Sequence, residues 1–252
     1  MSSGPVPVFA GVLFDLDGVL IDSTEAILSL WRGLAAGHGR ALSPSAIRDD
    51  VLGCSPEHSV SALFGDLAPG TREEILRRVR AAETDLAFVE VPGAREILAA
   101  LGGAGVRLAL VTGASARRAR RVVDHLGVAS AFDAMVTWGD TARGKPAPDC
   151  YLLAARRLGL APADCLVVED APSGVRAASS AGAVTVGVGD APTLRAVGAT
   201  WTTPDLAALS VARRGAGVEL RLAGVPIAGL STAVGPATLP ATLPGTPAGT
   251  PA

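Results

Sequence analysis

The sequence contains little cysteine, and its cysteines are not spaced for a disulfide framework. Among its 252 residues there are three, Cys54, Cys150 and Cys165, and no two of them form a CxxC pair. An odd number of widely separated cysteines argues against a small secreted fold held together by disulfides. We therefore expect a reducing compartment and a cytoplasmic protein.

Charged and aromatic residues are also scarce, which argues against a nucleic-acid partner. Only 18% of the residues are charged, 4% are aromatic, and the formal net charge is −2. Proteins that bind nucleic acid usually present a clustered basic surface, often with aromatic residues between the charges. Four arginines do lie close together, at positions 117, 118, 120 and 121. Because the overall balance is slightly acidic, we interpret them as the solvated face of a helix.

Long apolar runs are absent as well. No stretch reaches the ~18–20 uninterrupted apolar residues that a membrane-spanning helix needs, and the first five residues, Met-Ser-Ser-Gly-Pro, include no basic residue. We expect no membrane partner and no nucleic-acid partner, and we expect a monomer.

Strand-like and helix-like segments alternate over most of the chain. From residue 89 to about 212, short apolar strands are separated by segments with helical periodicity, a pattern typical of parallel βαβ units. Together with residues 1–21, this region predicts an α/β fold with a Rossmann-like parallel sheet as its core. Residues 22–88 show only helical periodicity, so they predict an all-helical domain inserted into that core.

The carboxyl-terminal part departs from this alternation. Two weakly alternating segments, 209–213 and 218–222, are split by glycines and suggest a hairpin at the sheet edge, ending within residues 213–224. From residue 225 to 252 there is no charged residue, and Pro, Thr, Ala and Gly dominate. Such a segment buries too little apolar area to offset its chain entropy. We predict that residues 225–252 are disordered.

Two carboxylates follow the first apolar strand directly. Asp15 and Asp17 come after Val12-Leu-Phe14, and Gly18 ends the strand. Their spacing places both side chains on one side of the chain, where two like charges are costly unless a cation or a shared proton relieves them. A divalent metal on Asp15, with Asp17 free to carry a proton, would resolve the conflict. The pair is therefore a candidate nucleophile and general acid.

Three further motifs are expected at the carboxyl ends of strands. Thr112, with the N–H of Gly113, follows a strand and could bind a phosphate, or it could merely cap the next helix. Lys145 lies in the string Arg-Gly-Lys-Pro-Ala-Pro-Asp, where it could be solvated or be aimed by the prolines at a phosphoryl group. Glu169 and Asp170 could begin a helix or complete a carboxylate-rich Mg²⁺ site.

Taken in order, these motifs closely resemble those of the haloacid dehalogenase-like phosphohydrolases, over roughly residues 9–210. The resemblance implies that Asp15 attacks phosphorus while Asp17 handles the proton of the leaving group. It also implies a helical cap that closes over the active site. The resemblance implies four catalytic residues, Asp15, Asp17, Thr112 and Lys145, and phosphate-binding residues that include Gly113. The implied ligands of Mg²⁺ are Asp15, Asp17 and Asp170. Glu169 would contribute by contacting these ligands or by binding the ion through water.

Within this family the sequence is most similar to phosphatases of sugar phosphates and glycerol phosphates. β-Phosphoglucomutases share the core and cap, but they carry a histidine where this chain has Ile27 and an arginine in a cap loop whose counterpart here is Leu52-Gly-Cys-Ser-Pro. In that loop, Cys54 and Ser55 are the candidates for substrate contact. We predict an Mg²⁺-dependent phosphatase of small phosphate esters, and a mutase, a phosphoglycolate phosphatase, a dehalogenase or an inactive binding module are the alternatives.

Overall fold

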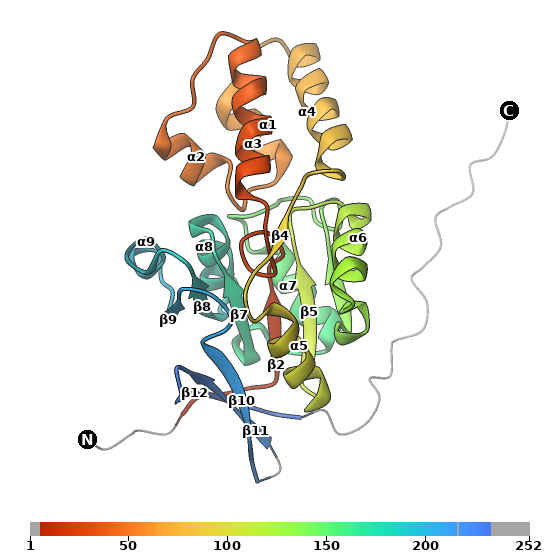
Figure 1. The fold of residues 1–252 in the computed structure, drawn as a ribbon. Coiled ribbons are helices and arrows are strands. Elements are labelled where there is room, and N and C mark those ends of the chain that lie inside the picture. Colours follow the sequence, from red (N-terminus) through yellow and green to blue (C-terminus); the bar gives the residue numbers. More distant parts are fainter. Residues whose placement is uncertain (1–5, 216, 233–252) are drawn as a thin grey trace, which may run out of the picture.

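A parallel β-sheet forms the centre of the molecule in the computed structural model, which describes residues 6–215 and 217–232 (Figure 1). The sheet has six strands in the order β6-β5-β2-β7-β8-β9, and every pair in it is parallel. In that order the strands are Ala134–Val136, Arg107–Val111, Gly11–Phe14, Cys165–Glu169, Val184–Val188 and Trp201–Thr203. The predicted α/β fold with a parallel sheet is thus confirmed.

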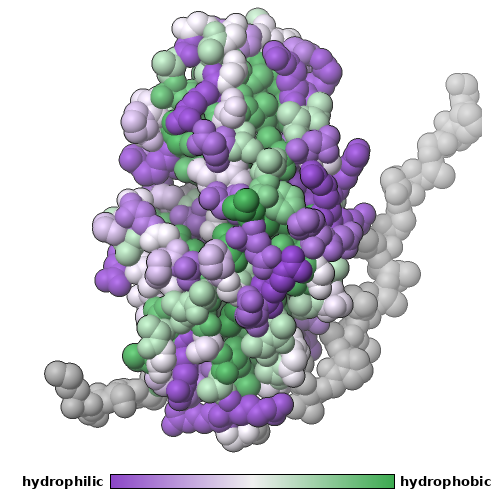
Figure 2. Space-filling model, viewed as in Figure 1, coloured by the Kyte–Doolittle hydropathy of each residue, from purple (hydrophilic) through white to green (hydrophobic). Residues whose placement is uncertain are grey.

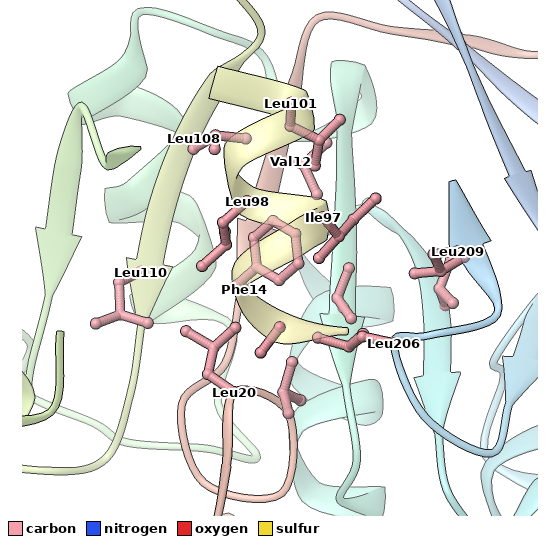
Figure 3. Close-up of a cluster of buried hydrophobic side chains, with 14 of the residues drawn as sticks. Val12, Phe14, Leu20, Ile97, Leu98, Leu101, Leu108, Leu110, Leu206 and Leu209 are labelled. Atoms are coloured by element: carbon pink, nitrogen blue, oxygen red, sulfur yellow. The ribbon is translucent and has the colours of Figure 1, made fainter. Parts of the chain in front are cut away.

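Helices cover both faces of this sheet. Side chains alternate along each strand, so Val12 and Phe14 of β2 point to one apolar cluster and Leu13 to the other. Figure 3 shows helix α5 lying over Val12 and Phe14. The helices of the first face are α5 (Ala94–Gly103) and α6 (Ala116–Leu126), and those of the second are α7 (Asp149–Leu158) and α8 (Pro172–Ala181). Burial on both faces explains why the strands are almost wholly apolar.

Four helices between β3 and β4 form a separate layer, which we call the helical insert. They are α1 (Thr24–Gly37), α2 (Pro44–Asp50), α3 (Pro56–Phe64) and α4 (Pro69–Glu83). The insert packs around its own apolar cluster, which includes Trp31, Phe64 and Ile75. Figure 1 shows it above the end of the sheet at which the parallel strands finish.

Two short strands join the insert to the core. β3 (Ile21–Asp22) and β4 (Val89–Glu90) pair antiparallel, so the chain leaves and re-enters the core at one place. Two adjacent connections are the geometry of a hinge, since a rotation there moves the whole insert. Among the described residues, no helix is both long enough and apolar enough to cross a membrane.

A second sheet contradicts part of the sequence prediction. β10 (Leu209–Arg214), β11 (Gly217–Leu222) and β12 (Val225–Leu230) form a meander, and β12 also pairs with β1 (Val8–Phe9). The predicted hairpin is present, but in this four-stranded sheet rather than at the edge of the central one. The prediction of disorder is wrong for residues 225–230, and its remainder from residue 233 lies outside the described residues.

The turn and the packing explain why this segment is ordered. Ala223 and Gly224 both have positive φ, as a tight hairpin turn with the twist of its strands requires. Ile227 and Leu230 are buried against the same cluster as Phe14. The uncharged composition gave no sign of this order, because the few apolar side chains of the segment join a core built elsewhere in the chain.

Two elements of the core were not predicted at all. Helix α9 spans Ala191–Ala196 and strand β9 spans Trp201–Thr203, which adds the last parallel strand beside β8. A proline in the first turn of α9 is the signal that could have located it. The short 3₁₀ turns Ala129–Ala131 and Pro162–Asp164 complete the described structure.

The packing of β12 can be tested with two aliphatic residues on that strand. Ile227 is 6% exposed and Val225 is 63% exposed. We expect Ile227→Ala to lower the free energy of unfolding by about 2–4 kcal/mol, because truncation leaves a cavity in the core. Val225→Ala should change it by less than about 0.5 kcal/mol. Urea unfolding of both variants measures the difference, and equal stabilities would show that β12 does not contribute to the core.

Candidate active site

The predicted site residues meet at the carboxyl ends of the three central strands. Asp15 follows β2, Thr112 follows β5, and Glu169 is the last residue of β7. Because β2 lies between β5 and β7 in a parallel sheet, these ends are neighbours. Such an edge is the usual binding site of parallel α/β folds, and here the helical insert lies above it.

The ammonium group of Lys145 lies at the centre of the site and contacts several of its residues. Its ammonium donates to Asp15 Oδ1 at 2.6 Å, to Glu169 Oε1 at 2.6 Å and to the carbonyl of Val111 at 3.1 Å. An ammonium has three hydrogens, so all of its donors are used. Burial opposes the charged form, but the carboxylates of Asp15 and Glu169 hold the pKa of Lys145 well above its ordinary value. The site therefore contains a fixed positive charge.

Glu169 orients this lysine. Its Oε1 also accepts from the hydroxyl of Tyr151 at 2.7 Å, and its Oε2 accepts from the N–H groups of Asp170 and Ala171. Both oxygens thus have two donors each, and the side chain is fully buried. Sequence reasoning missed Tyr151. This arrangement favours the prediction that Glu169 does not bind the metal directly but supports the residues that would.

Asp15 and Asp170 form the part of the site that could hold a cation. Oxygens of Asp15, Glu169 and Asp170 lie within 4.8 Å of one another, and Asp170 Oδ1 is buried without a hydrogen-bond partner. Burial, followed by the neighbouring carboxylates, raises the pKa of Asp170 well above its ordinary value. Only glycine fits at position 18, since a Cβ there would lie 1.9 Å from Asp170 Oδ2. Close-set acidic oxygens with an unsatisfied acceptor fit a hard divalent cation.

Asp15 itself is a buried carboxylate with a displaced pKa. Burial raises it, the ammonium of Lys145 lowers it, and Glu169 raises it again, which gives a pKa of about 7. Asp15 is therefore partly protonated near neutral pH, and its ionised form lies beside a fixed cation with little water around it. That environment suits a nucleophile.

Asp17 lies outside the acidic cluster and has partners of its own. Its Oδ1 accepts from the Ser23 hydroxyl at 2.5 Å and from Arg118 Nη2 at 2.7 Å. Arg118 is 2% exposed, and its Nη1 donates to the carbonyl of Glu83 at 2.8 Å. The side chain of Asp17 thus lies outside the group of oxygens that could hold a cation, and its role as a ligand of Mg²⁺ stays a prediction.

The interpretation of the arginine cluster as a solvated face is wrong for one of its members. Arg117, Arg120 and Arg121 are exposed, and Figure 2 shows hydrophilic residues over α6, but Arg118 is buried. Arg118 lies four residues before Val122 and eight before Leu126, so it belongs to the buried stripe of the helix. That spacing is the signal that could have identified it.

Thr112 and Gly113 border the site as predicted. The Thr112 hydroxyl accepts from the N–H of Ala114, and its own hydrogen has no acceptor among the described residues, so it is available for donation. Capping of the next helix is done by Ser115, whose hydroxyl accepts from the N–H of Arg118. Thr112 is thus not the cap, and its binding role stays open.

The two insert residues predicted to touch substrate have structural partners. The Ser55 hydroxyl caps α3 by accepting from the N–H of His58, and the Cys54 thiol donates to the carbonyl of Asp49. Burial raises the pKa of Cys54 to about 11, so the thiol is neutral near pH 7. Both residues still lie on cavity walls, and contact with substrate stays a prediction.

Two cavities lie between the insert and the core. The inner cavity, about 80 Å³, has a polar wall that includes Asp15, Asp17 and Glu83, and its apolar wall includes Trp31 and Val79. It is well below the roughly 300–1,000 Å³ of ordinary ligand pockets. The outer cavity, about 630 Å³, is lined by Ser55, Arg80, Trp138 and Lys145, among other residues, and shares Gly53, Thr112 and Gly113 with the inner one. A substrate larger than phosphate does not fit within the inner cavity alone.

The geometry favours chemistry on a phosphate ester. A buried carboxylate next to a fixed ammonium could attack phosphorus, a second acid lies two residues away, and a cation could sit on Asp15 and Asp170. Fixed positive charges around a transferring phosphoryl group are the main catalytic requirement of such reactions.

Comparisons with known proteins agree with this reading. A family model described as haloacid dehalogenase-like hydrolase matches residues 9–182. The chain is 37% identical to hexitol phosphatase A of Escherichia coli over 74% of its length and 88% of that protein. It is 31% identical to fructose-1-phosphate phosphatase of the same organism (69% and 93% covered) and 31% identical to β-phosphoglucomutase of Bacillus subtilis (71% and 82% covered).

Solved structures show the same architecture. A hydrolase from Pseudomonas syringae matches with a TM-score of 0.69 and 26% identity, covering 78% of this chain and 94% of that one. β-Phosphoglucomutase from Clostridium difficile matches with a TM-score of 0.68 and 23% identity, covering 79% and 92%. The matched family model spans the strands and loops that carry Asp15, Thr112, Lys145 and Asp170. The chain therefore belongs to the haloacid dehalogenase-like hydrolases.

Proposed function

We propose that the protein is an Mg²⁺-dependent phosphatase of small phosphomonoesters, most suited to sugar or polyol phosphates. The observation that carries this proposal is the contact of Lys145 with Asp15 beside the unsatisfied carboxylate of Asp170. Relatives whose names describe phosphatases of hexitol phosphate and fructose 1-phosphate support the substrate class. The cytoplasmic location and the monomeric state expected from the sequence stay predictions.

The proposed reaction has two steps, formation of an aspartyl phosphate on Asp15 and its hydrolysis. A carboxylate oxygen of Asp15 attacks phosphorus, and Asp17 gives a proton to the bridging oxygen as the alcohol leaves. Asp17 then takes a proton from the water that hydrolyses the aspartyl phosphate. Lys145 keeps its positive charge beside the reacting groups throughout both steps. Mg²⁺, held by Asp15, Asp170 and the backbone of Asp17, would supply further neutralisation of the phosphoryl charge.

The charges near the inner cavity favour a substrate with one phosphate. Its wall carries Asp15, Asp17 and Glu83, and its one arginine, Arg118, is paired with Asp17. A mutase must hold a second phosphate, and a phosphoglycolate phosphatase must hold a carboxylate. Arg80 and Arg143 of the outer cavity are paired with Glu57 and Asp149. A neutral leaving group therefore fits these walls better than an anionic one.

A panel of phosphate esters tests the proposal. Phosphate release should depend on Mg²⁺ and be highest with hexose, hexitol or glycerol phosphates. Phosphoglycolate should be a poor substrate, because its carboxylate meets acidic walls without a free cation. Conversion of β-glucose 1-phosphate to the 6-phosphate without release would instead make the protein a mutase, and inactivity on every ester would contradict the proposal.

The role of the nucleophile is tested by Asp15→Asn. An amide does not attack phosphorus, so we expect phosphate release to fall by about 10⁴-fold or more. Tyr151→Phe is a useful comparison, since it removes one donor from Glu169 but leaves Asp15 and Lys145 in contact. It should lose far less activity. Turnover by the Asp15→Asn variant near the wild-type rate would exclude an aspartyl phosphate on this residue.

Binding of Mg²⁺ should depend on pH through Asp15. Its folded pKa of about 7 lies above the ordinary 3.8, so the metal-free protein loses stability as pH rises between these values. Below pH 7 the cation must displace a proton from Asp15, and the raised pKa of Asp170 adds to this competition, so its affinity weakens by at least about tenfold per pH unit. We expect Mg²⁺ to raise the unfolding temperature more at pH 8 than at pH 6.

Thermal unfolding with and without Mg²⁺ measures this effect, with Asp170→Asn as the control. That variant removes the unsatisfied carboxylate, so its unfolding temperature should respond little at either pH. Equal Mg²⁺ responses at pH 6 and pH 8 in the wild-type protein would show that Asp15 is not the group that the cation deprotonates.

A further inference from the structure

Arg118 is a buried cation that neither the sequence motifs nor the proposed mechanism uses. It is 2% exposed, yet it comes from a helix whose other arginines face solvent. A buried charge is retained only when it is well paired, because its desolvation costs several kcal/mol. Such a group next to a reactive carboxylate needs an explanation.

The guanidinium of Arg118 connects two parts of the molecule. Nη2 donates to Asp17 Oδ1 at 2.7 Å, and Nη1 donates to the carbonyl of Glu83 at 2.8 Å. Glu83 is the last residue of α4, so this carbonyl lies at the end of an insert helix, where the helix dipole favours a cation. One rigid, planar group thus joins the insert to the carboxylate of the core.

Both partners of Asp17 approach the same oxygen. Ser23 and Arg118 donate to Oδ1, whereas none of the described residues donates to Oδ2. In a carboxylic acid the oxygen without the proton is the better acceptor, so these two donors favour protonation on Oδ2. They also prevent the carboxyl group from turning, since rotation would break both bonds.

We propose that Arg118 is the positioning residue of the general acid, and that it assigns Oδ2 of Asp17 as the atom that carries the proton. This inference rests on the role of Asp17 in the proposed function. As the bond from phosphorus to the ester oxygen breaks, the proton on Oδ2 moves to that oxygen and the alcohol leaves. The Asp17 carboxylate keeps the electron pair of the O–H bond, and Arg118 stabilises its charge.

The choice of leaving group separates this role from a purely structural one. An aliphatic alcohol departs slowly unless it is protonated, whereas p-nitrophenol is acidic enough to leave as an anion. The value of kcat/KM covers only the steps up to departure of the leaving group, so later hydrolysis of the enzyme intermediate does not enter. Misfolding lowers kcat/KM for both substrates equally, and their ratio is unaffected by it.

We would therefore measure kcat/KM in wild type and Arg118→Met with p-nitrophenyl phosphate and with the best sugar or polyol phosphate of the panel. General acids contribute about 10²–10⁴-fold to such reactions. For Arg118→Met we expect the ratio of alkyl to aryl activity to fall by about 10²-fold. Arg118→Lys, whose ammonium keeps the charge without the planar fork, should give an intermediate ratio.

Arg121→Met is the matched control. Arg121 lies on the same helix, and its guanidinium donates to the carbonyl of Thr84, next to Glu83, but it does not touch Asp17. Its ratio should equal that of wild type. An equal drop for Arg121→Met and Arg118→Met would overturn the inference, because both would then act only by holding the insert.

Asp17→Asn shows whether a failure belongs to Arg118 or to the proposed function. If Asp17→Asn lowers the ratio and Arg118→Met does not, the positioning role is overturned and the phosphatase mechanism stands. If Asp17→Asn leaves the ratio unchanged, Asp17 is not the general acid, and both the mechanism and the inference fall. A fall in the ratio for Asp17→Asn and Arg118→Met, with Arg121→Met unchanged, is the expected result.

Discussion

The contact between Lys145 and the two carboxylates of Asp15 and Glu169 is the interaction on which the site depends. All three groups are buried, and each would be costly to bury alone. Glu169 is fixed by Tyr151 and two backbone N–H groups, which keeps the ammonium in place when Asp15 reacts. The central strands bring these groups together, because parallel strands end at a common edge of the sheet.

The helical insert gives this edge its low dielectric. It covers Asp15 and leaves a small inner cavity beside that residue, so each charge there interacts more strongly than it would in water. Arg80 of the insert also lies over the ring of Trp138 in the core, 4.4 Å from its centroid. This cation–π contact and the two hydrogen bonds of the Arg118 guanidinium join the insert to the core. Movement of the insert away from the core must therefore break them.

Short sequence motifs predicted most residues of this site, but they could not predict which residues far apart in the chain contact each other. Asp15, Thr112 and Asp170 follow apolar strands directly, so their common location follows from the topology of the sheet. Arg118 lies 101 positions from its partner Asp17, and nothing in the local sequence names that partner. β12 was misjudged for a related reason, since its stability comes from apolar contacts with a distant cluster and not from its own composition.

The charge balance of the site argues for the order in which ligands bind under the proposed function. Asp15, Asp17, Glu169 and Asp170 face two cations, Lys145 and Arg118, and both cations are already paired with carboxylates. The raised pKa values of Asp15 and Asp170 favour their protonated forms in the metal-free site, and the paired cations leave no free positive charge there for a phosphate ester. Its approach is unfavourable until a divalent cation occupies the oxygens of Asp15 and Asp170. Under the proposed function, Mg²⁺ would thus serve substrate binding as well as the chemical step.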